Sequence, residues 1–359
     1  MLNLYRKTYL EVYLDKVYDN YKLISNFVKG KTVIPVVKAN AYGLGAKKIT
    51  QFLHQNGVNY FAVATVEEAL ELRAVSSTID ILVMGLINEE DFLTLSQNNI
   101  TVTIPNQNLM NAACNVNLPM KIHLKVDTGM NRLGFNDKSD IINAFSRITQ
   151  SRTLDLEGVF THLATSDSND SYAWNQIQTF KDTLDILPYK PKMVHVSNSS
   201  ATLKFEKDMP FTTHARVGIS LYGETLEKDI TYLHQTFKIK SVIKEIKLLK
   251  KGEKLGYDIT YQAQEDEWIA ILQVGYADGI WRANQNGMVS INHKLFPIVG
   301  RICMDQMFIK VDETIRKNDI VILVGDNNVS VNDMAKRLNT IPHEILCSFS
   351  QRIPRIYKS

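Results

Sequence analysis

The strongest constraint on the fold is a regular alternation, over residues 8–219, of short apolar segments and longer amphipathic ones. The short segments are rich in Val and Ile, as strands buried on both faces are, and the longer ones have the apolar spacing of helices. The predicted strands are 8–14, 32–37, 60–64, 79–85, 100–104, 120–127, 154–163, 193–197 and 212–219, with predicted helices at 15–28, 46–55, 65–72, 89–97, 106–115, 137–150, 172–187 and 200–205. About eight β-then-α units in about 220 residues predict a parallel (β/α)8 barrel.

A doubly wound open sheet is the alternative arrangement of the same elements. That fold carries a glycine-rich dinucleotide-binding turn after its first strand, and this sequence has none there. The sequence therefore favours the barrel.

A change of pattern after Tyr222-Gly223 predicts a second domain. Strand-like segments with short turns follow at 238–249, 268–274, 288–311 and 319–324, with one helix candidate at 331–338. A chain of 359 residues is also too long for one small core. We expect a barrel domain at 1–233 and a mainly β domain at 234–359.

The bulk composition excludes several classes of partner. A formal charge of +3 with scattered basic residues gives no reason to expect nucleic acid or an anionic membrane as partner. Cys114, Cys303 and Cys347 are widely separated, which is typical of unpaired thiols in a reducing compartment. The N-terminus has the pattern of neither a signal peptide nor a membrane span. We expect a cytoplasmic location.

The segment Thr32–Gly45, TVIPVVKANAYGLG, places Lys38 at the exit of a buried strand. Glycines and a predicted helix follow, so the backbone can approach a ligand there. One interpretation is a lysine that extends to solvent from a strand end. The other is a partly desolvated amine that forms a Schiff base with an aldehyde cofactor.

Other polar residues also follow predicted barrel strands, where functional groups gather. They are Lys125, Arg132, His162, His195, Ser199 and Arg216. On the residues alone, a lysine and an arginine seven positions apart are two solvated charges, and a strand-end histidine is a structural residue. Ser199 at a helix start suits a phosphate. The sequence has no HxH, HExxH, Cys/His cluster or GxSxG, so we predict neither a metal site nor a serine hydrolase.

Eight segments, taken in order along nearly the whole chain, resemble the motifs of the alanine racemases. They are VVKANAYGLG, HLKVDTGMNRLG, VFTHLATSD, HVSNSSAT, ARVGISLYG, LGYDITY, VGYADGIWR and GRICMDQ. The resemblance implies a pyridoxal-phosphate barrel, a β-rich C-terminal domain and a homodimer with shared active sites.

The resemblance also implies which residues bind the cofactor. Lys38 would carry pyridoxal 5'-phosphate, and Arg216 would face the pyridine nitrogen with support from His195. Tyr42, Ser199, Gly218 and Ile219 would form the phosphate site. Because a guanidinium is always protonated, the ring nitrogen would stay unprotonated and the cofactor would favour simple proton exchange.

The catalytic and substrate residues follow from the same resemblance. Lys38 and Tyr257 would be the two bases, one on each face of the substrate carbanion. Arg132 would orient the substrate carboxylate, held by Lys125 as a carbamate. The remaining roles fall to His162, which would link the tyrosine to Arg216, and to Tyr276, Met304 and Asp305 at the entrance and pocket.

Three positions depart from the usual family pattern. Asn131 and Asp258 stand where the family usually has glycine, and Gln351 in CSFSQRIPRIY stands where many members have a phosphate-contacting tyrosine. Because of these departures, the sequence does not decide three features: the geometry of the loop that holds Arg132, the surroundings of Tyr257, and one of the phosphate contacts.

The predicted function is interconversion of L- and D-alanine, which supplies D-alanine for peptidoglycan. A racemase for serine or for a broader set of amino acids stays open, because single pocket residues can set such specificity. A non-catalytic pyridoxal-phosphate carrier and an amino-acid decarboxylase share parts of the architecture. The additional C-terminal domain argues against the carrier, and the LGYDITY and HLKVDTGMNRLG segments argue against the decarboxylase.

Overall fold

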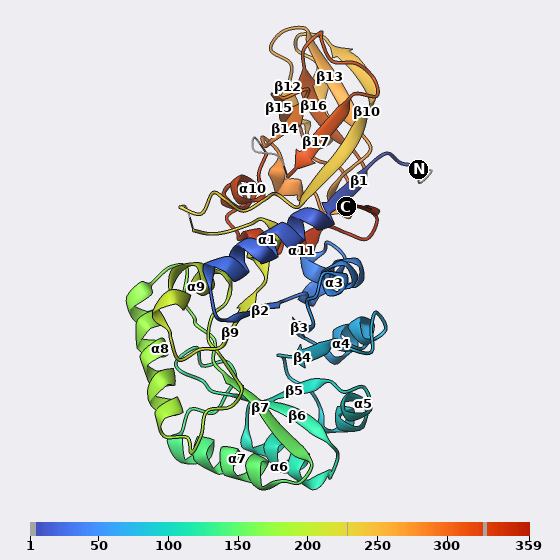
Figure 1. The fold of residues 1–359 in the computed structure, drawn as a ribbon. Helices are drawn as coiled ribbons and strands as arrows, with labels where there is room; N and C mark the ends of the chain where they lie inside the picture. Colours follow the sequence, from blue (N-terminus) through green and yellow to red (C-terminus); the bar gives the residue numbers. More distant parts are fainter. Residues whose placement is uncertain (1–4, 228, 326–328) are drawn as a thin grey trace. The chain divides into compact units, whose positions relative to one another are not determined.

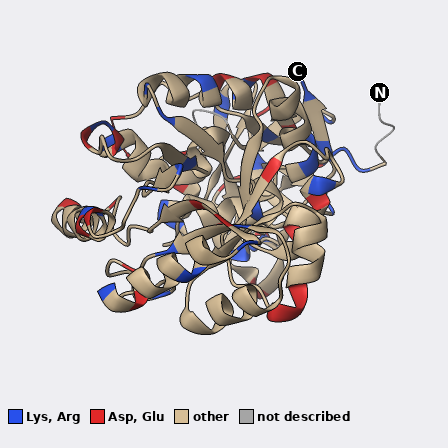
Figure 2. Ribbon diagram, turned by 60° about the horizontal axis from the view of Figure 1, so that its bottom comes forward, with Lys and Arg blue, Asp and Glu red and all other residues tan. Residues whose placement is uncertain are grey.

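The computed structural model describes residues 5–227, 229–325 and 329–359. The chain forms two compact units, here called the barrel unit and the β unit (Figure 1). The barrel unit comprises Val17–Ala41 and Gly45–Leu233; the β unit comprises the residues up to Lys16, Tyr42–Leu44 and His234–Ser359. Basic and acidic residues are interspersed along the ribbons, in keeping with the formal charge of +3 (Figure 2).

Eight parallel strands of the described chain form the barrel sheet, in the order β2-β9-β8-β7-β6-β5-β4-β3. A parallel bridge between Val36 and Ala62 joins its two edges, and the Val37 N–H donates to the Ala62 carbonyl at 2.9 Å. The strands are β2 (Thr32–Pro35), β3 (Tyr60–Val63), β4 (Asp80–Val83), β5 (Thr101–Ile104), β6 (Met120–Lys125), β7 (Leu154–Phe160), β8 (Met193–His195) and β9 (His214–Val217). The predicted barrel is confirmed.

Helices lie outside the barrel strands in Figure 1. They are α1 (Leu14–Phe27), α3 (Ala46–Gln55), α4 (Val66–Arg73), α5 (Phe92–Gln97), α6 (Gln107–Asn115), α7 (Lys138–Gln150), α8 (Asp170–Asp185) and α9 (Ser199–Lys204). Side chains of Asn106, Asp137, Asn169 and Asn198 cap helix N-termini, and Thr65 with Glu68 forms a capping box. The short segment α2 (Lys38–Tyr42) is not a regular helix.

The β unit is built on a sheet that, within the described ranges, has the order β13-β16-β15-β14-β17-β10-β1-β18. Its members are β1 (Tyr9–Tyr13), β10 (Phe237–Leu249), β13 (Glu267–Leu272), β14 (Met288–Ile291), β15 (Lys294–Val299), β16 (Met307–Val311), β17 (Ile320–Val324) and β18 (Arg355–Lys358). A small hairpin, β11 (Lys254–Leu255) with β12 (Tyr261–Gln262), and helices α10 (Val331–Arg337) and α11 (Pro342–Ser348) complete it. Sequence reasoning missed α11, although Pro342 at its first turn is a start signal.

The first strand corrects the expected division of the chain. We placed residues 1–233 together, but β1 lies in the β unit because it is hydrogen-bonded between two strands of that unit. It is antiparallel to β10, with Leu10 opposite Ile239, and parallel to β18, with Leu10 opposite Arg355. A pattern of alternating apolar residues predicts a strand but does not identify its neighbours.

Among the described residues, no helix has the length and apolar character that crossing a membrane requires.

Replacement of Leu10 tests this placement of β1. Leu10 is fully buried, so Leu10→Ala should lower the free energy of unfolding by about 2–5 kcal/mol. Hydrogen exchange should accelerate in β10 and β18, while the barrel strands keep their protection. The control is Leu82→Ala at a fully buried barrel position, which should accelerate exchange in the barrel strands instead. Faster exchange in β2 on replacing Leu10 would contradict the placement.

Candidate active site

Lys38 lies three residues beyond the end of β2 and begins a turn of unusual conformation. The four residues Ala39–Tyr42 all have φ between 50° and 54°, in the left-handed region. Such a conformation costs about 1–2 kcal/mol for each L-residue, so other interactions must hold it. Within the barrel unit, the Ala41 N–H donates to the Val37 carbonyl at 2.8 Å, and the Asn40 side chain accepts from the Ala46 N–H at 2.9 Å.

Glu68 fixes the start of this turn. Its Oε1 accepts from the Ala39 N–H at 2.6 Å, and its Oε2 accepts from the Ala64 N–H at 2.8 Å. One carboxylate therefore ties the residue after Lys38 to the end of β3. The sequence showed Glu68 only as part of a capping box; its contact with the Lys38 turn depends on tertiary structure.

Arg216 is buried near the end of β9. Its Nη1 donates to His195 Nδ1 at 2.6 Å, and its Nη2 donates to the carbonyls of Thr161 and Val196 and to His162 Nδ1. Burial lowers the pKa of Arg216 to about 10, which leaves the guanidinium charged at neutral pH. Among the described residues, its hydrogen bonds go to the carbonyls of Thr161 and Val196 and to two imidazoles, and none of these partners is a carboxylate.

The two histidines beside Arg216 are neutral acceptors. Burial, followed by the charge of Arg216, lowers the pKa of both His162 and His195 well below the usual value. The charge of Lys38 also lowers the pKa of His162. Because a guanidinium has only N–H donors, each imidazole must present an unprotonated Nδ1 to Arg216.

Donors for an anion gather around Ser199 at the start of α9. The Ser199 Oγ accepts from the Gly218 N–H at 3.0 Å and from the Ser220 N–H at 3.4 Å, and Ile219 is buried between them. The Ser220 hydroxyl is buried and has no hydrogen-bond partner among the described residues. Backbone N–H groups, hydroxyls and an orphaned buried hydroxyl fit a phosphate group.

Lys125 ends β6 on the interior of the barrel. Its side chain is buried, with Nζ 4.7 Å from the centre of the Phe160 ring. Burial, and then the charges of Arg216 and Arg132, lowers the pKa of Lys125 to about 7. A partly neutral amine at this position is the form that can react with carbon dioxide to give a carbamate.

The loop after β6 is closed on itself and carries Arg132. A bridge pairs Val126 with Phe135, and Asp127 Oδ1 accepts from the Gly129 and Asn131 N–H groups. Arg132 is exposed and lines a hollow of about 340 Å³, together with Pro105, Asn106, Asp127, Asn131, Leu133, Gly134 and Asn136.

The left-handed conformation explains two departures from the family pattern. Asn131 has φ 56° and Asp258 has φ 57°, so both positions need a backbone conformation that glycine adopts freely. Asn and Asp are the other residues that tolerate it best. Asn131 and Asp258 therefore hold the left-handed conformation without glycine. Asp258 also pairs with Arg301 Nε at 2.8 Å.

The remaining predicted residues lie in the β unit. Tyr257, Met304 and Asp305 line a second hollow, of about 530 Å³, with Gly256, Cys303, Gln306 and Phe308. Tyr257 is 67% exposed and Met304 52%. Asp305 pairs with Arg352 at 2.6 Å, and the Tyr276 N–H donates to the Cys303 carbonyl at 3.0 Å. The structure thus brings the predicted C-terminal residues together.

Tyr42 also groups with the β unit. Its ring centre is 5.8 Å from that of His343, and burial raises the pKa of its hydroxyl. Gln351, at the third departure, is exposed. Within each unit the predicted residues cluster, with Lys38, Lys125, His162, His195, Ser199 and Arg216 on the barrel unit.

The shifted pKa of Lys125 has a consequence for stability. The unfolded chain keeps a lysine pKa near 10.5, so between about pH 7 and about pH 10 the unfolded state binds more protons than the folded state. Stability should rise with pH in that window, by at most about 1.4 kcal/mol per pH unit, relative to Lys125→Met. Denaturant unfolding in bicarbonate-depleted buffer measures it.

Lys121 on the same strand is the matched control, because its pKa is raised instead. Lys121→Met should leave the rise over this window in place. An equal pH dependence in wild type and Lys125→Met would contradict the assigned pKa.

Comparisons with known proteins identify the family. The model of the alanine racemase N-terminal domain matches residues 12–226, and that of the C-terminal domain matches 236–357. Alanine racemase from Staphylococcus carnosus is 37% identical, covering 99% of this chain and 95% of that protein; the one from Geobacillus kaustophilus is 38% identical, covering 98% and 95%.

Solved structures agree with this result. Alanine racemase from E. faecalis has a TM-score of 0.94 at 34% identity over 100% of both chains. A histidine racemase from Leuconostoc mesenteroides subsp. sake has a TM-score of 0.90 at 26% identity over 99% of both chains. With both domain models matched and relatives similar over nearly their full length, this chain belongs to the alanine racemase family.

Proposed function

We propose that this protein interconverts L- and D-alanine with pyridoxal 5'-phosphate as cofactor. The observation that carries the proposal is the buried Arg216 guanidinium, whose hydrogen bonds go to carbonyls and neutral imidazoles beside the donors around Ser199. A guanidinium held in this way suits an uncharged ring nitrogen, and the Ser199 donors suit a phosphate.

Bound pyridoxal phosphate supplies an electron-withdrawing ring that acidifies the Cα–H bond of an attached amino acid. Lys38 would hold the cofactor covalently. Ser199, Gly218 and Ile219, with Tyr42, would hold its phosphate. Arg216, supported by His195, would donate to the ring nitrogen and keep a proton from binding there, which would favour proton exchange over other reactions.

Racemisation needs one base on each face of the substrate, and Lys38 and Tyr257 have these roles. Lys38 moves the proton at one face of Cα and Tyr257 at the other. His162, whose Nδ1 accepts from Arg216, keeps its proton on Nε2, and this N–H would donate to the phenol oxygen of Tyr257. Arg132 orients the substrate carboxylate, and a carbamate on Lys125 would hold Arg132.

A homodimer with shared sites completes the proposal. Tyr257, Tyr276 and Met304 are each more than 40% exposed in this chain, as residues that reach into a second copy would be. In this arrangement Tyr257, Tyr276, Met304 and Asp305 serve the barrel of the other subunit. Symmetric dimers of this kind are the commonest oligomers.

The proposed location and role follow the family. The three cysteines, all in the described part of the chain, are unpaired thiols, which supports a reducing cytoplasm. D-Alanine formed there would supply peptidoglycan synthesis. A non-catalytic carrier is disfavoured, because the match to the C-terminal domain model covers residues 236–357.

Specificity is the part of the proposal that the fold does not decide. A histidine racemase shares the fold at a TM-score of 0.90, so the same architecture accepts different side chains. A hydroxyl or methylene changes binding by only about 1–3 kcal/mol in an apolar pocket. Serine or broad-specificity racemisation is therefore the second candidate.

A panel of L-amino acids tests the substrate. The purified enzyme should racemise alanine with the highest kcat/KM, followed by serine, as measured by chiral chromatography. Tyr257→Phe is the control, because it removes the second base but keeps the ring, and it should lose at least about 100-fold in kcat. A higher kcat/KM for serine or histidine would replace alanine as the substrate.

Mixed dimers test the shared site. Lys38→Ala and Tyr257→Phe homodimers should both be nearly inactive. If each site takes Lys38 from one chain and Tyr257 from the other, a mixed dimer has one intact site and one that lacks both groups. Random reassortment then restores about a quarter of the wild-type activity.

Differently tagged chains, refolded together or co-expressed, show that subunits have exchanged. No recovery in a mixture of proven exchange would place both residues in one chain's site. High activity of Tyr257→Phe alone would deny Tyr257 its role as a base.

A further inference from the structure

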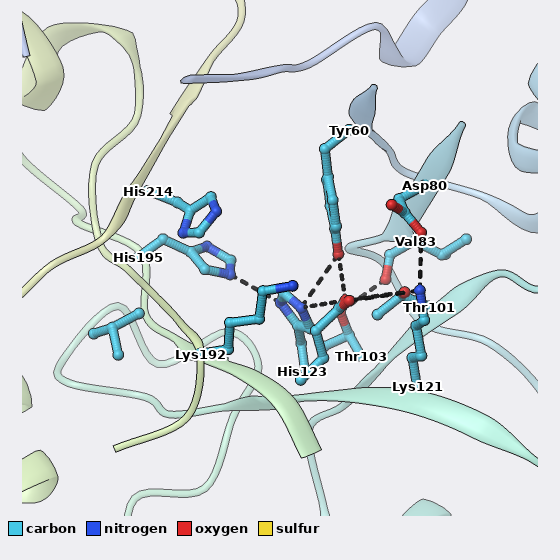
Figure 3. Close-up of polar contacts among 12 residues, drawn as sticks. Tyr60, Asp80, Val83, Thr101, Thr103, Lys121, His123, Lys192, His195 and His214 are labelled. Atoms are coloured by element: carbon cyan, nitrogen blue, oxygen red, sulfur yellow. Dashed lines mark hydrogen bonds and ion pairs between the residues drawn. The ribbon is translucent and has the colours of Figure 1, made fainter. Parts of the chain in front are cut away.

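A chain of buried hydrogen bonds continues from Arg216 into the barrel, beyond the residues that the proposed reaction uses. Figure 3 shows the part of it at His195 and His123. His195 Nε2 lies 2.9 Å from His123 Nδ1, and His123 Nε2 lies 3.1 Å from Glu157 Oε2. Both imidazoles are fully buried. Four side chains, Arg216, His195, His123 and Glu157, thus form one line, here called the histidine relay.

Donor and acceptor chemistry gives the relay one direction. Arg216 can only donate, so His195 Nδ1 accepts and the His195 proton is on Nε2. That N–H then donates to His123 Nδ1, which places the His123 proton on Nε2, where it faces Glu157. A guanidinium at one end and a carboxylate at the other therefore specify the same tautomer in both histidines.

Charges around Glu157 keep it an anion. Burial alone would raise its pKa, but hydrogen bonds from His123 and Tyr60 and the charge of Lys121 lower the pKa to about 2. The Tyr60 hydroxyl donates to Oε2 at 2.7 Å, Thr101 Oγ1 donates at 3.2 Å, and Lys121 Nζ lies 3.7 Å from Oε1. Other titratable groups around the relay include Asp80, Asp155, Lys125, His162, Lys192, Glu206 and His214.

The backbone of β7 leaves room for the His123 ring. The pairing of β6 with β7 shifts register between Ile122 and His123, so that Glu157 is the extra residue on β7. A Cβ atom at Gly158 would lie 2.6 Å from the His123 ring. A glycine and a bulge inside a buried strand indicate that something must approach closely, and here it is His123.

We propose that Glu157 and His123 are positioning residues for the cofactor: through His195 they keep Nδ1 unprotonated toward Arg216 and so hold the guanidinium aimed at the ring nitrogen. With a neutral residue at 157, only Arg216 would favour this tautomer, and the alternative tautomer of both histidines would become populated. His195 could then carry its proton on Nδ1, and Arg216 would lose an acceptor and its fixed orientation.

This inference rests on the proposed cofactor role of Arg216, but its first test does not require activity. Nitrogen NMR of full-length protein labelled in its histidine rings distinguishes protonated from unprotonated ring nitrogens. In the wild-type protein, His195 and His123 should both be neutral with the proton on Nε2. A proton on His195 Nδ1 would overturn the proposal, whereas an enzyme inactive on alanine with this tautomer pattern would contradict only the proposed function.

Glu157→Gln removes the charge and keeps the shape. It should produce signals of a second His195 tautomer and lower kcat for alanine by about 10-fold with little change in KM, because the substrate contacts are untouched. Gly158→Ala keeps the charge but displaces the His123 ring, and it should lower kcat similarly.

Asp155→Asn is the matched control. It removes the same charge from the same strand at an exposed position, and it should leave both the tautomer and kcat unchanged. Circular dichroism confirms that each variant is folded. An unchanged His195 tautomer in folded Glu157→Gln, or an equal effect of Asp155→Asn, would overturn the proposal.

Discussion

The buried charge of Arg216 is the interaction on which the barrel's interior depends. A guanidinium removed from water is costly unless its N–H groups are satisfied, and here carbonyls of Thr161 and Val196 and two imidazoles satisfy them. The ends of two neighbouring strands, β7 and β8, supply these acceptors to Arg216 on β9. The strand register therefore fixes the arginine before any ligand binds.

This charge also sets the protonation of its neighbours. It lowers the pKa of His162, His195 and Lys125, each of which is already disfavoured as a cation by burial. The histidines become neutral acceptors, and the lysine becomes a partly neutral amine. Together with burial, one fixed cation therefore has two effects at neighbouring strand ends. It keeps His162 and His195 neutral, so that they accept hydrogen bonds from Arg216, and it makes Lys125 a partly neutral, reactive amine beside the loop of Arg132.

The two bases that we propose, Lys38 and Tyr257, are held in different ways. Lys38 immediately precedes a left-handed turn that Glu68 fixes from the end of β3, so the lysine is held by a rigid backbone. Tyr257 is exposed on the β unit, and the residue after it, Asp258, adopts the left-handed backbone conformation. An exposed tyrosine in one chain suits a site that a second subunit completes.

The sequence alone determined the (β/α)8 barrel, the β-rich second domain and, through short motifs, the residues that gather at the strand ends. Strand and helix patterns are local, and the motif residues sit where strands end, so both can be read without coordinates. Only the tertiary structure decided that β1 belongs to the β unit, that Glu68 reaches Ala39, and that His123 meets Glu157 beneath Arg216. His123 stood in a motif without a role and Gly158 within an apolar strand. Their meaning depends on which strands are neighbours and in what register, because hydrogen bonds between residues far apart in sequence leave no local pattern.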